Sequence, residues 1–112
     1  MTSHTAPTGT DPIIYDAARS HYLAYLERAN AYARPGTPHN PRKLTLDGMP
    51  ARERALIEWC QQSNDRLDAA APWPADDAPD RAALMRAARV ARRAIRADEE
   101  RAFALMYLGV TA

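Results

Sequence analysis

Residues 86–97, RAARVARRAIRA, contain five arginines, five alanines and no acidic residue. The guanidinium group of arginine is planar and always charged, and its N–H groups can pair with both oxygens of a carboxylate or a phosphate. Arginines at these spacings are typical of a helix face that binds anions. The candidate binding residues are the six arginines of residues 80–97, namely Arg81, Arg86, Arg89, Arg92, Arg93 and Arg96.

The charges in this segment are strongly segregated. At 100° per residue the six arginines fall within about 140° of a helix, and the opposite side consists of Leu84, Ala87, Ala88, Ala91, Ala94 and Ile95. Six arginines and Asp80 give residues 80–97 a charge of +5, whereas the whole chain carries +1. We expect the apolar side to face the bundle and the arginines to face solvent. Reversing the charges of Arg89, Arg93 and Arg96 should then leave stability nearly unchanged.

Three interpretations of the arginines remain open. The leading one is a non-catalytic adaptor or regulatory module that docks on an acidic protein surface, on another protein or on a second copy of the chain. The alternative is sequence-independent binding to the phosphate backbone of a nucleic acid. In the third interpretation the face is solvated and binds nothing. Secondary contacts are expected from exposed basic or aromatic side chains elsewhere in the chain, which are Arg42, Lys43, Tyr22, Tyr25 and Trp73.

Residues with catalytic potential do not cluster in the sequence. His4, His21 and His39 are far apart, and the four glycines form no phosphate-binding loop. Cys60 is the single cysteine, so neither an internal disulfide nor a cysteine-based zinc site is expected. We therefore predict no enzyme activity, cofactor, metal or small-molecule substrate, although a small subunit of an enzyme complex is a further alternative.

The elements that must position these residues are three helices, at 12–33, 51–69 and 79–108. Asp11 and Pro12 form a helix start, with a capping carboxylate followed by proline. Residues 34–50 contain four prolines and two glycines and should form an irregular connection. The fold class is therefore all-α: a small bundle of three main helices with an irregular proline-rich connection and a long C-terminal helix. Residues 1–10 are expected to be a flexible tail, and residues 11–112 a single domain.

Apolar stripes predict how the helices pack. The first helix carries a stripe rich in tyrosine, which consists of Tyr15, Ala18, Tyr22, Tyr25, Ala29 and Tyr32. This stripe either packs inward or forms an exposed aromatic platform. The second helix should bury Leu56, Trp59, Cys60, Ser63, Leu67 and Ala70. Thirty residues of helix would span about 45 Å, so the third helix should either kink near Asp98 or protrude. Trp73, between two prolines, is either a lid on the helices or a docking anchor.

The composition indicates a thin core. The chain has 24 alanines but only 16 leucine, isoleucine, valine and phenylalanine residues. Because burial contributes about 25 cal/mol per Å², a partner or second copy should stabilise this fold appreciably. The sequence has no membrane span and no basic, apolar leader, so a cytoplasmic location is expected. Fourteen arginines against one lysine, with abundant alanine, suggest a GC-rich bacterial or phage source.

Overall fold

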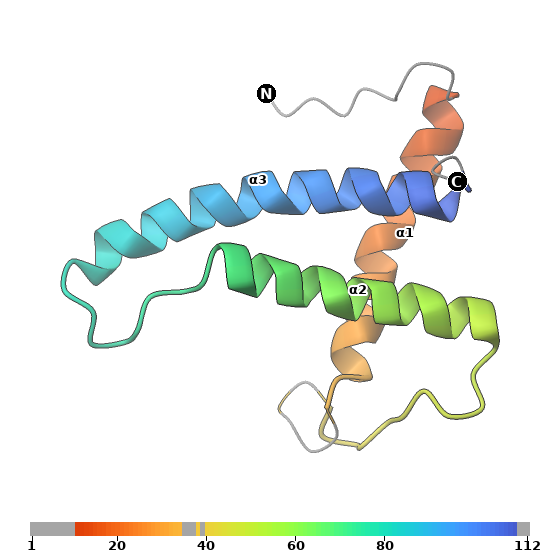
Figure 1. The fold of residues 1–112 in the computed structure, drawn as a ribbon, viewed down its shortest axis with the longest axis horizontal. Helices are drawn as coiled ribbons and strands as arrows, with labels where there is room; N and C mark the ends of the chain where they lie inside the picture. The colour runs from red at the N-terminus through yellow and green to blue at the C-terminus, as the bar shows by residue number, and fades with distance from the viewer. Residues whose placement is uncertain (1–10, 35–37, 39, 110–112) are drawn as a thin grey trace.

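A computed structural model describes residues 11–34, 38 and 40–109, and these residues form three helices and no strand. The helices are α1 (Pro12–Ala31), α2 (Ala51–Ala70) and α3 (Arg81–Tyr107) (Figure 1). The predicted all-α bundle of three main helices is thus confirmed, and the predicted helix ends are within two residues of those observed. The expected tail at residues 1–10 lies outside the described residues.

The predicted start of α1 is confirmed, and a turn precedes α2. The Asp11 carboxylate accepts hydrogen bonds from the backbone N–H groups of Ile13 and Ile14, at 2.8 and 3.4 Å, and Pro12 needs no such partner. Asp47 and Gly48 form the turn, with Gly48 at a φ of +78° that glycine adopts without strain. These local signals set where α1 and α2 begin.

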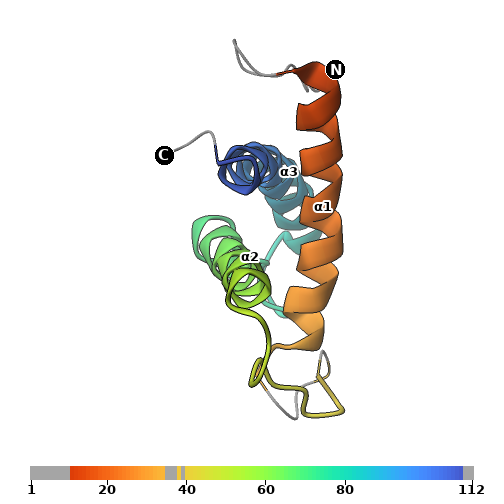
Figure 2. The ribbon, with the colours of Figure 1, turned by 90° about the vertical axis from the view of Figure 1, so that its right-hand side faces the viewer.

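The helices are arranged in two layers. Helices α2 and α3 run side by side in opposite directions, and α1 crosses both of them on one face (Figures 1 and 2). The opposite face of the α2–α3 layer has no helix on it in the described chain (Figure 2). One helix therefore covers only part of a two-helix layer.

The core lies where α1 crosses the other two helices. Phe103, from the C-terminal half of α3, is fully buried, and its ring lies 5.4–5.9 Å from those of Tyr22, Tyr25, Trp59 and Tyr107. The tyrosine stripe of α1 therefore packs inward, as the first of its two interpretations predicted. The second helix buries Leu56, Ile57, Cys60, Ser63 and Leu67, whereas Trp59 is half-buried and Ala70, predicted to be inward, is exposed.

The connection between α1 and α2 is held by one buried amide. Asn40 donates from Nδ2 to the carbonyl oxygens of Ala33 and Leu44 at 2.7 and 2.8 Å, and its Oδ1 accepts from the Leu44 N–H at 2.7 Å. Of the two leucines in this connection, Leu46 packs against the core and Leu44 is exposed. The Asn40 side chain thus adds three hydrogen bonds to the backbone turns of this segment, in which Lys43 N–H donates to the Asn40 carbonyl and Met49 N–H to the Leu46 carbonyl, both at 3.2 Å.

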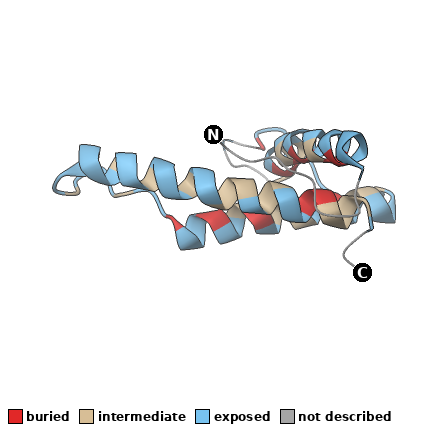
Figure 3. Cartoon of the chain, turned by 90° about the horizontal axis from the view of Figure 1, so that it is seen from above, coloured by how far each residue is buried: buried red, intermediate tan, exposed pale blue. Residues whose placement is uncertain are grey.

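Helix α3 protrudes rather than kinks. It continues through Asp98 as one helix, and its N-terminal half extends beyond α1 (Figure 1). Seen from above, this half is mostly exposed, and the fully buried residues of α3, Phe103 and Ala104, lie in the other half (Figure 3). None of the described helices combines the length and hydropathy needed to cross a membrane.

Candidate functional site

The side chains of α3 fall into rows that repeat every seven residues, which is close to two helical turns. Glu100 belongs to one such row and contacts α1, because Arg19 Nε donates to its carboxylate at 2.7 Å. Arg93 and Arg86 precede Glu100 by seven and fourteen residues, so they continue the same row toward the protruding end. Arg89, Arg96 and Phe103 form the adjacent row. The side of α3 that faces the bundle near Phe103 and Glu100 is therefore the same side that carries the arginines nearer its N-terminus.

Two of the six arginines are consequently part of the bundle. Arg96 donates from Nη1 to the Tyr22 hydroxyl at 2.8 Å and from Nη2 to Asn64 Oδ1 at 3.1 Å. The Tyr22 hydroxyl also lies 2.6 Å from the buried Ser63 Oγ. Arg96 therefore completes a polar network that joins all three helices, and its expected place on a solvent-facing surface is wrong.

Arg92 is also turned toward the bundle. It donates to the Asp68 carboxylate and to the carbonyl oxygen of Ala71, both at 2.8 Å, and its guanidinium lies 4.6 Å from the centre of the Trp73 ring. Arg92 thus fixes the C-terminal end of α2 and the start of the linker to α3. Trp73 does fold back, but it covers an arginine and remains 48% exposed.

The orientation of α3 was predicted wrongly because Phe103 and Ala104 decide it. Within residues 81–97 the apolar side is the side of Leu84 and Ala91, yet both of these residues are exposed. The buried aromatic ring lies farther along, on the arginine side of the helix. Burying one large ring outweighs burying several alanines, since the gain scales with apolar area. Four residues of the predicted inward stripe are therefore exposed, and the other two, Ala88 and Ile95, are only half-buried.

Three arginines remain available for binding: Arg86, Arg89 and Arg93, which we call the arginine face. All three are exposed and make no hydrogen bond or ion pair with the described part of the chain. Val90 lies between Arg86 and Arg93 at helical spacing and is 68% exposed. Arg81 is exposed too, but it lies 3.5 Å from Asp76. Val90 therefore belongs to this surface, although the prediction from the sequence, which considered only charged residues here, did not include it.

Two of the three acidic side chains of α3, Glu99 and Glu100, hold the bundle together rather than neutralise the arginine face. Glu99 accepts from Arg66 Nε at 3.1 Å and Glu100 from Arg19. Burial opposes ionisation of Glu99, but the hydrogen bonds from Arg66 and the nearby charge of Arg96 outweigh it and lower the pKa of this carboxyl. The charge of the free arginines is therefore uncompensated within α3.

The expected secondary contacts separate into buried and exposed groups. Tyr22 and Tyr25 are buried, and Glu53 accepts a hydrogen bond from the Tyr25 hydroxyl at 2.8 Å. Neither ring can meet a partner, so the exposed aromatic platform is ruled out. Arg42 and Lys43 are exposed in the connection between α1 and α2, whereas His39 lies outside the described residues.

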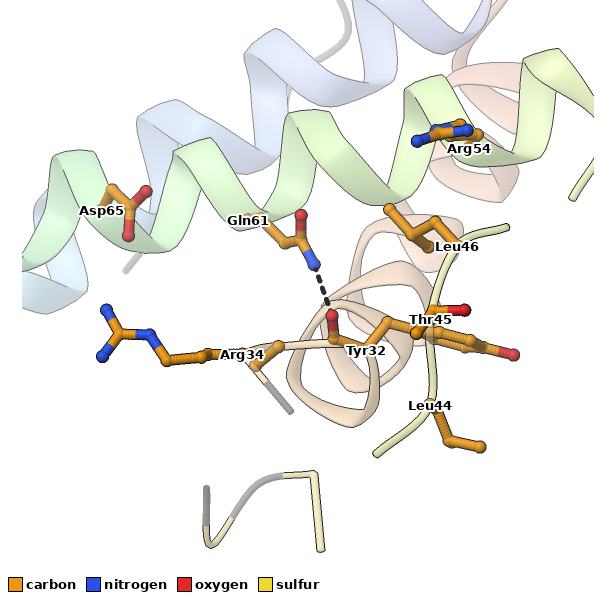
Figure 4. A pocket seen from close by; sticks show the side chains of 9 residues that line it. Tyr32, Arg34, Leu44, Thr45, Leu46, Arg54, Gln61 and Asp65 are labelled. Carbon is orange, nitrogen blue, oxygen red and sulfur yellow. Dashed lines mark hydrogen bonds between the residues drawn. The ribbon is translucent and has the colours of Figure 1, made fainter. Parts of the chain in front are cut away.

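A hollow of about 490 Å³ lies between the end of α1, residues 44–46 and α2. One hydrogen bond crosses its wall, from Gln61 Nε2 to the carbonyl oxygen of Tyr32 at 3.1 Å (Figure 4). Arg54 lies at the opposite end of the hollow from Arg34 and Asp65, and the three side chains do not point at a common centre (Figure 4). A ligand site needs a few convergent polar groups, so this hollow is a weaker candidate than the arginine face.

Cys60 is fully buried, and burial raises the pKa of its thiol to about 12. Because the thiolate is the reactive form, we expect a disulfide reagent to leave Cys60 unmodified in the folded protein at neutral pH. The reagent should modify it stoichiometrically in denaturant, as measured by the absorbance of the released thiol. Rapid modification of the folded protein would contradict the buried position of Cys60.

Comparisons of the chain with protein families, with characterised proteins and with solved structures found no match. The geometry of the site is therefore the basis of the functional proposal that follows.

Proposed function

We propose that this chain is a non-catalytic binding module that docks through the arginine face of α3 on an acidic protein surface. The observation that carries the proposal is that Arg86, Arg89 and Arg93 share the side of α3 that packs against α1 farther along. On the protruding half this side has no partner in the described chain. The arginine face is thus a continuation of a helix-packing surface.

The surroundings of the arginines favour a protein over a nucleic acid. Val90 places an exposed apolar side chain between two arginines, which suits a partner segment with an aliphatic residue flanked by carboxylates. The tyrosines that could stack on bases are buried. Exposed Asp76, Asp77 and Asp80 lie at the start of α3 and would repel a phosphate backbone. The preferred ligand is therefore an acidic, partly apolar helix or surface.

A charge-reversed triple variant, Arg86→Glu, Arg89→Glu and Arg93→Glu, tests this proposal against a displayed random peptide library. We expect the wild-type chain to enrich peptides with Asp or Glu at helical spacing around an aliphatic residue. The variant should lose these peptides by a factor of at least about 100, because like charges at three contacts replace attractive ones. Its circular dichroism spectrum and thermal midpoint should stay close to those of the wild type.

A matched control reverses three other exposed arginines, Arg34, Arg54 and Arg101, of which only Arg54 has an ion-pair partner in the described chain, Glu58 at 3.8 Å. It changes the net charge by the same amount and should retain the selected peptides. Loss of binding in the control would show that net charge, rather than the arginine face, governs binding. Binding of random duplex DNA with a log affinity–log salt slope of about −2 to −3, as expected for three phosphate contacts, would favour the nucleic-acid alternative instead.

A further inference from the structure

A second surface of α3 lies away from the arginine face. It consists of Leu84, Ala88, Ala91 and Ile95, which we call the apolar stripe, and it lies about 160° around the helix from the arginine face. Leu84 is 46% exposed and Ala91 is exposed, whereas Ala88 and Ile95 are half-buried. The protruding half of α3 appears accordingly as a mostly exposed helix in Figure 3.

The stripe borders a groove. A shallow, open hollow of about 400 Å³ lies between helix α3 and the segment that precedes it, with the end of α2 and Trp73 between Pro72 and Pro74 on one side and Leu84, Ala88 and Ala91 on the other. The Trp73 ring is held in place by the guanidinium of Arg92. The groove is therefore apolar and has one wall braced by a charged side chain.

The stripe also has a heptad register. Arg81, Leu84, Ala88, Ala91, Ile95 and Asp98 are separated alternately by three and four residues, the spacing of the a and d positions of a coiled coil. Asp98 is exposed in this register and has no hydrogen bond or ion pair in the described chain. Both ends of the register are therefore charged, with opposite signs, and its middle is apolar.

Two copies of this register are complementary to each other when the two helices run antiparallel. If a second α3 lies antiparallel with the two-fold axis midway between residues 89 and 90, Leu84 faces Ile95 of the other copy and Ala88 faces its Ala91. The same alignment places Arg81 opposite Asp98 at both ends. Large residues then pack against large ones, and small residues allow the two helices to approach closely at the centre. Each end of the paired segment, which we call a rim, carries an ion pair.

We infer that the apolar stripe is a self-association surface on which a second copy of this chain packs its own α3 in antiparallel orientation. Ile95 and Ala91 of the second copy enter the groove beside Trp73, and Arg81 exchanges its 3.5 Å contact with Asp76 for the second copy's Asp98. This surface goes beyond the proposed function and does not depend on it, since the arginine face stays open on the other side of α3.

Sedimentation velocity of the full chain over a wide concentration range tests the surface. The wild type should shift from monomer to dimer as concentration rises, and Ala91→Glu should remain monomeric with unchanged helix content, because Ala91 is exposed in the monomer. Ala82→Glu introduces the same charge at another exposed alanine of α3, off the stripe, and should still dimerise. A wild type that is monomeric up to its solubility limit would overturn the inference, as would a dimer that tolerates Ala91→Glu.

Exchange of the rim charges tests the register itself. Arg81→Asp and Asp98→Arg should each weaken self-association by about tenfold, because like charges then face each other at both rims. A mixture of the two variants should restore the wild-type association, since every rim in the mixed dimer again pairs opposite charges. If a mixture of the two variants associates no more strongly than either variant alone, this antiparallel register is excluded. A change in the fold of either variant would also leave association unrestored, and circular dichroism of each variant alone identifies that cause.

Discussion

Replacing Arg96 by glutamate should lower the free energy of unfolding by about 3 kcal/mol. The guanidinium of Arg96 donates to the Tyr22 hydroxyl and to Asn64, from the middle of a contact among all three helices. A carboxylate there could not donate these hydrogen bonds and would lie within one turn of Glu99 and Glu100. The Tyr22 hydroxyl keeps Ser63 as a partner, but losing hydrogen bonds from a charged donor costs about 1.5–3 kcal/mol, and the repulsion between carboxylates adds to that loss.

Arg93→Glu is the matched control, on the same helix and three residues earlier. Arg93 is exposed and unpaired in the described chain, so its reversal should change stability by no more than about 0.5 kcal/mol. Urea unfolding followed by circular dichroism at 222 nm measures both variants. Equal stabilities for the two would mean that Arg96 does not brace the bundle and that the solvent-facing position expected from the sequence was right.

The contrast between these two arginines shows which features the sequence pattern could predict and which it could not. Helix positions were predicted well because their signals are local: Asp11 and Pro12 at the start of α1, four prolines between α1 and α2, and Gly109 at a φ of +72° after α3. The tyrosine stripe of α1 was predicted correctly as one of two alternatives, because five of its six members are buried.

Local signals could not predict which side of α3 faces the bundle. Its N-terminal part has a clear apolar side, but periodicity shows only that a side is apolar and not that something covers it. Helix α1 meets α3 near Phe103 and leaves the first half of α3 unsupported, which follows from how far the helices overlap in space. The direction in which Arg92 and Arg96 point thus depends on tertiary contacts with Asp68, Tyr22 and Asn64.

The candidate site was therefore predicted in part. Arg86, Arg89 and Arg93 keep the exposed position expected of them, whereas two of the six arginines join the bundle. The expected apolar side of α3 becomes a second exposed surface instead of the core. Asp98 lies on that side too and has no hydrogen bond or ion pair in the described chain.

The last prediction concerns Phe103, the single phenylalanine of the chain. Phe103→Ala should lower the free energy of unfolding by about 3–5 kcal/mol. Its ring is 0% exposed and packs against four other aromatic rings drawn from all three helices. Alanine would leave a cavity that rigid neighbouring rings cannot fill by small shifts, and the loss is a large part of the stability of an ordinary small domain.

Leu23→Ala serves as the control, because Leu23 is 62% exposed on α1 and its truncation removes little buried area. It should shift the thermal midpoint by only a few degrees, while Phe103→Ala should unfold well below the wild type or not fold cooperatively at all. A Phe103→Ala protein as stable as the Leu23→Ala variant would show that α3 does not dock through its C-terminal half. In that case the burial of Arg92 and Arg96, and the exposure of the arginine face and the apolar stripe, would all have to be assigned again, since each follows from the direction that Phe103 gives to the helix.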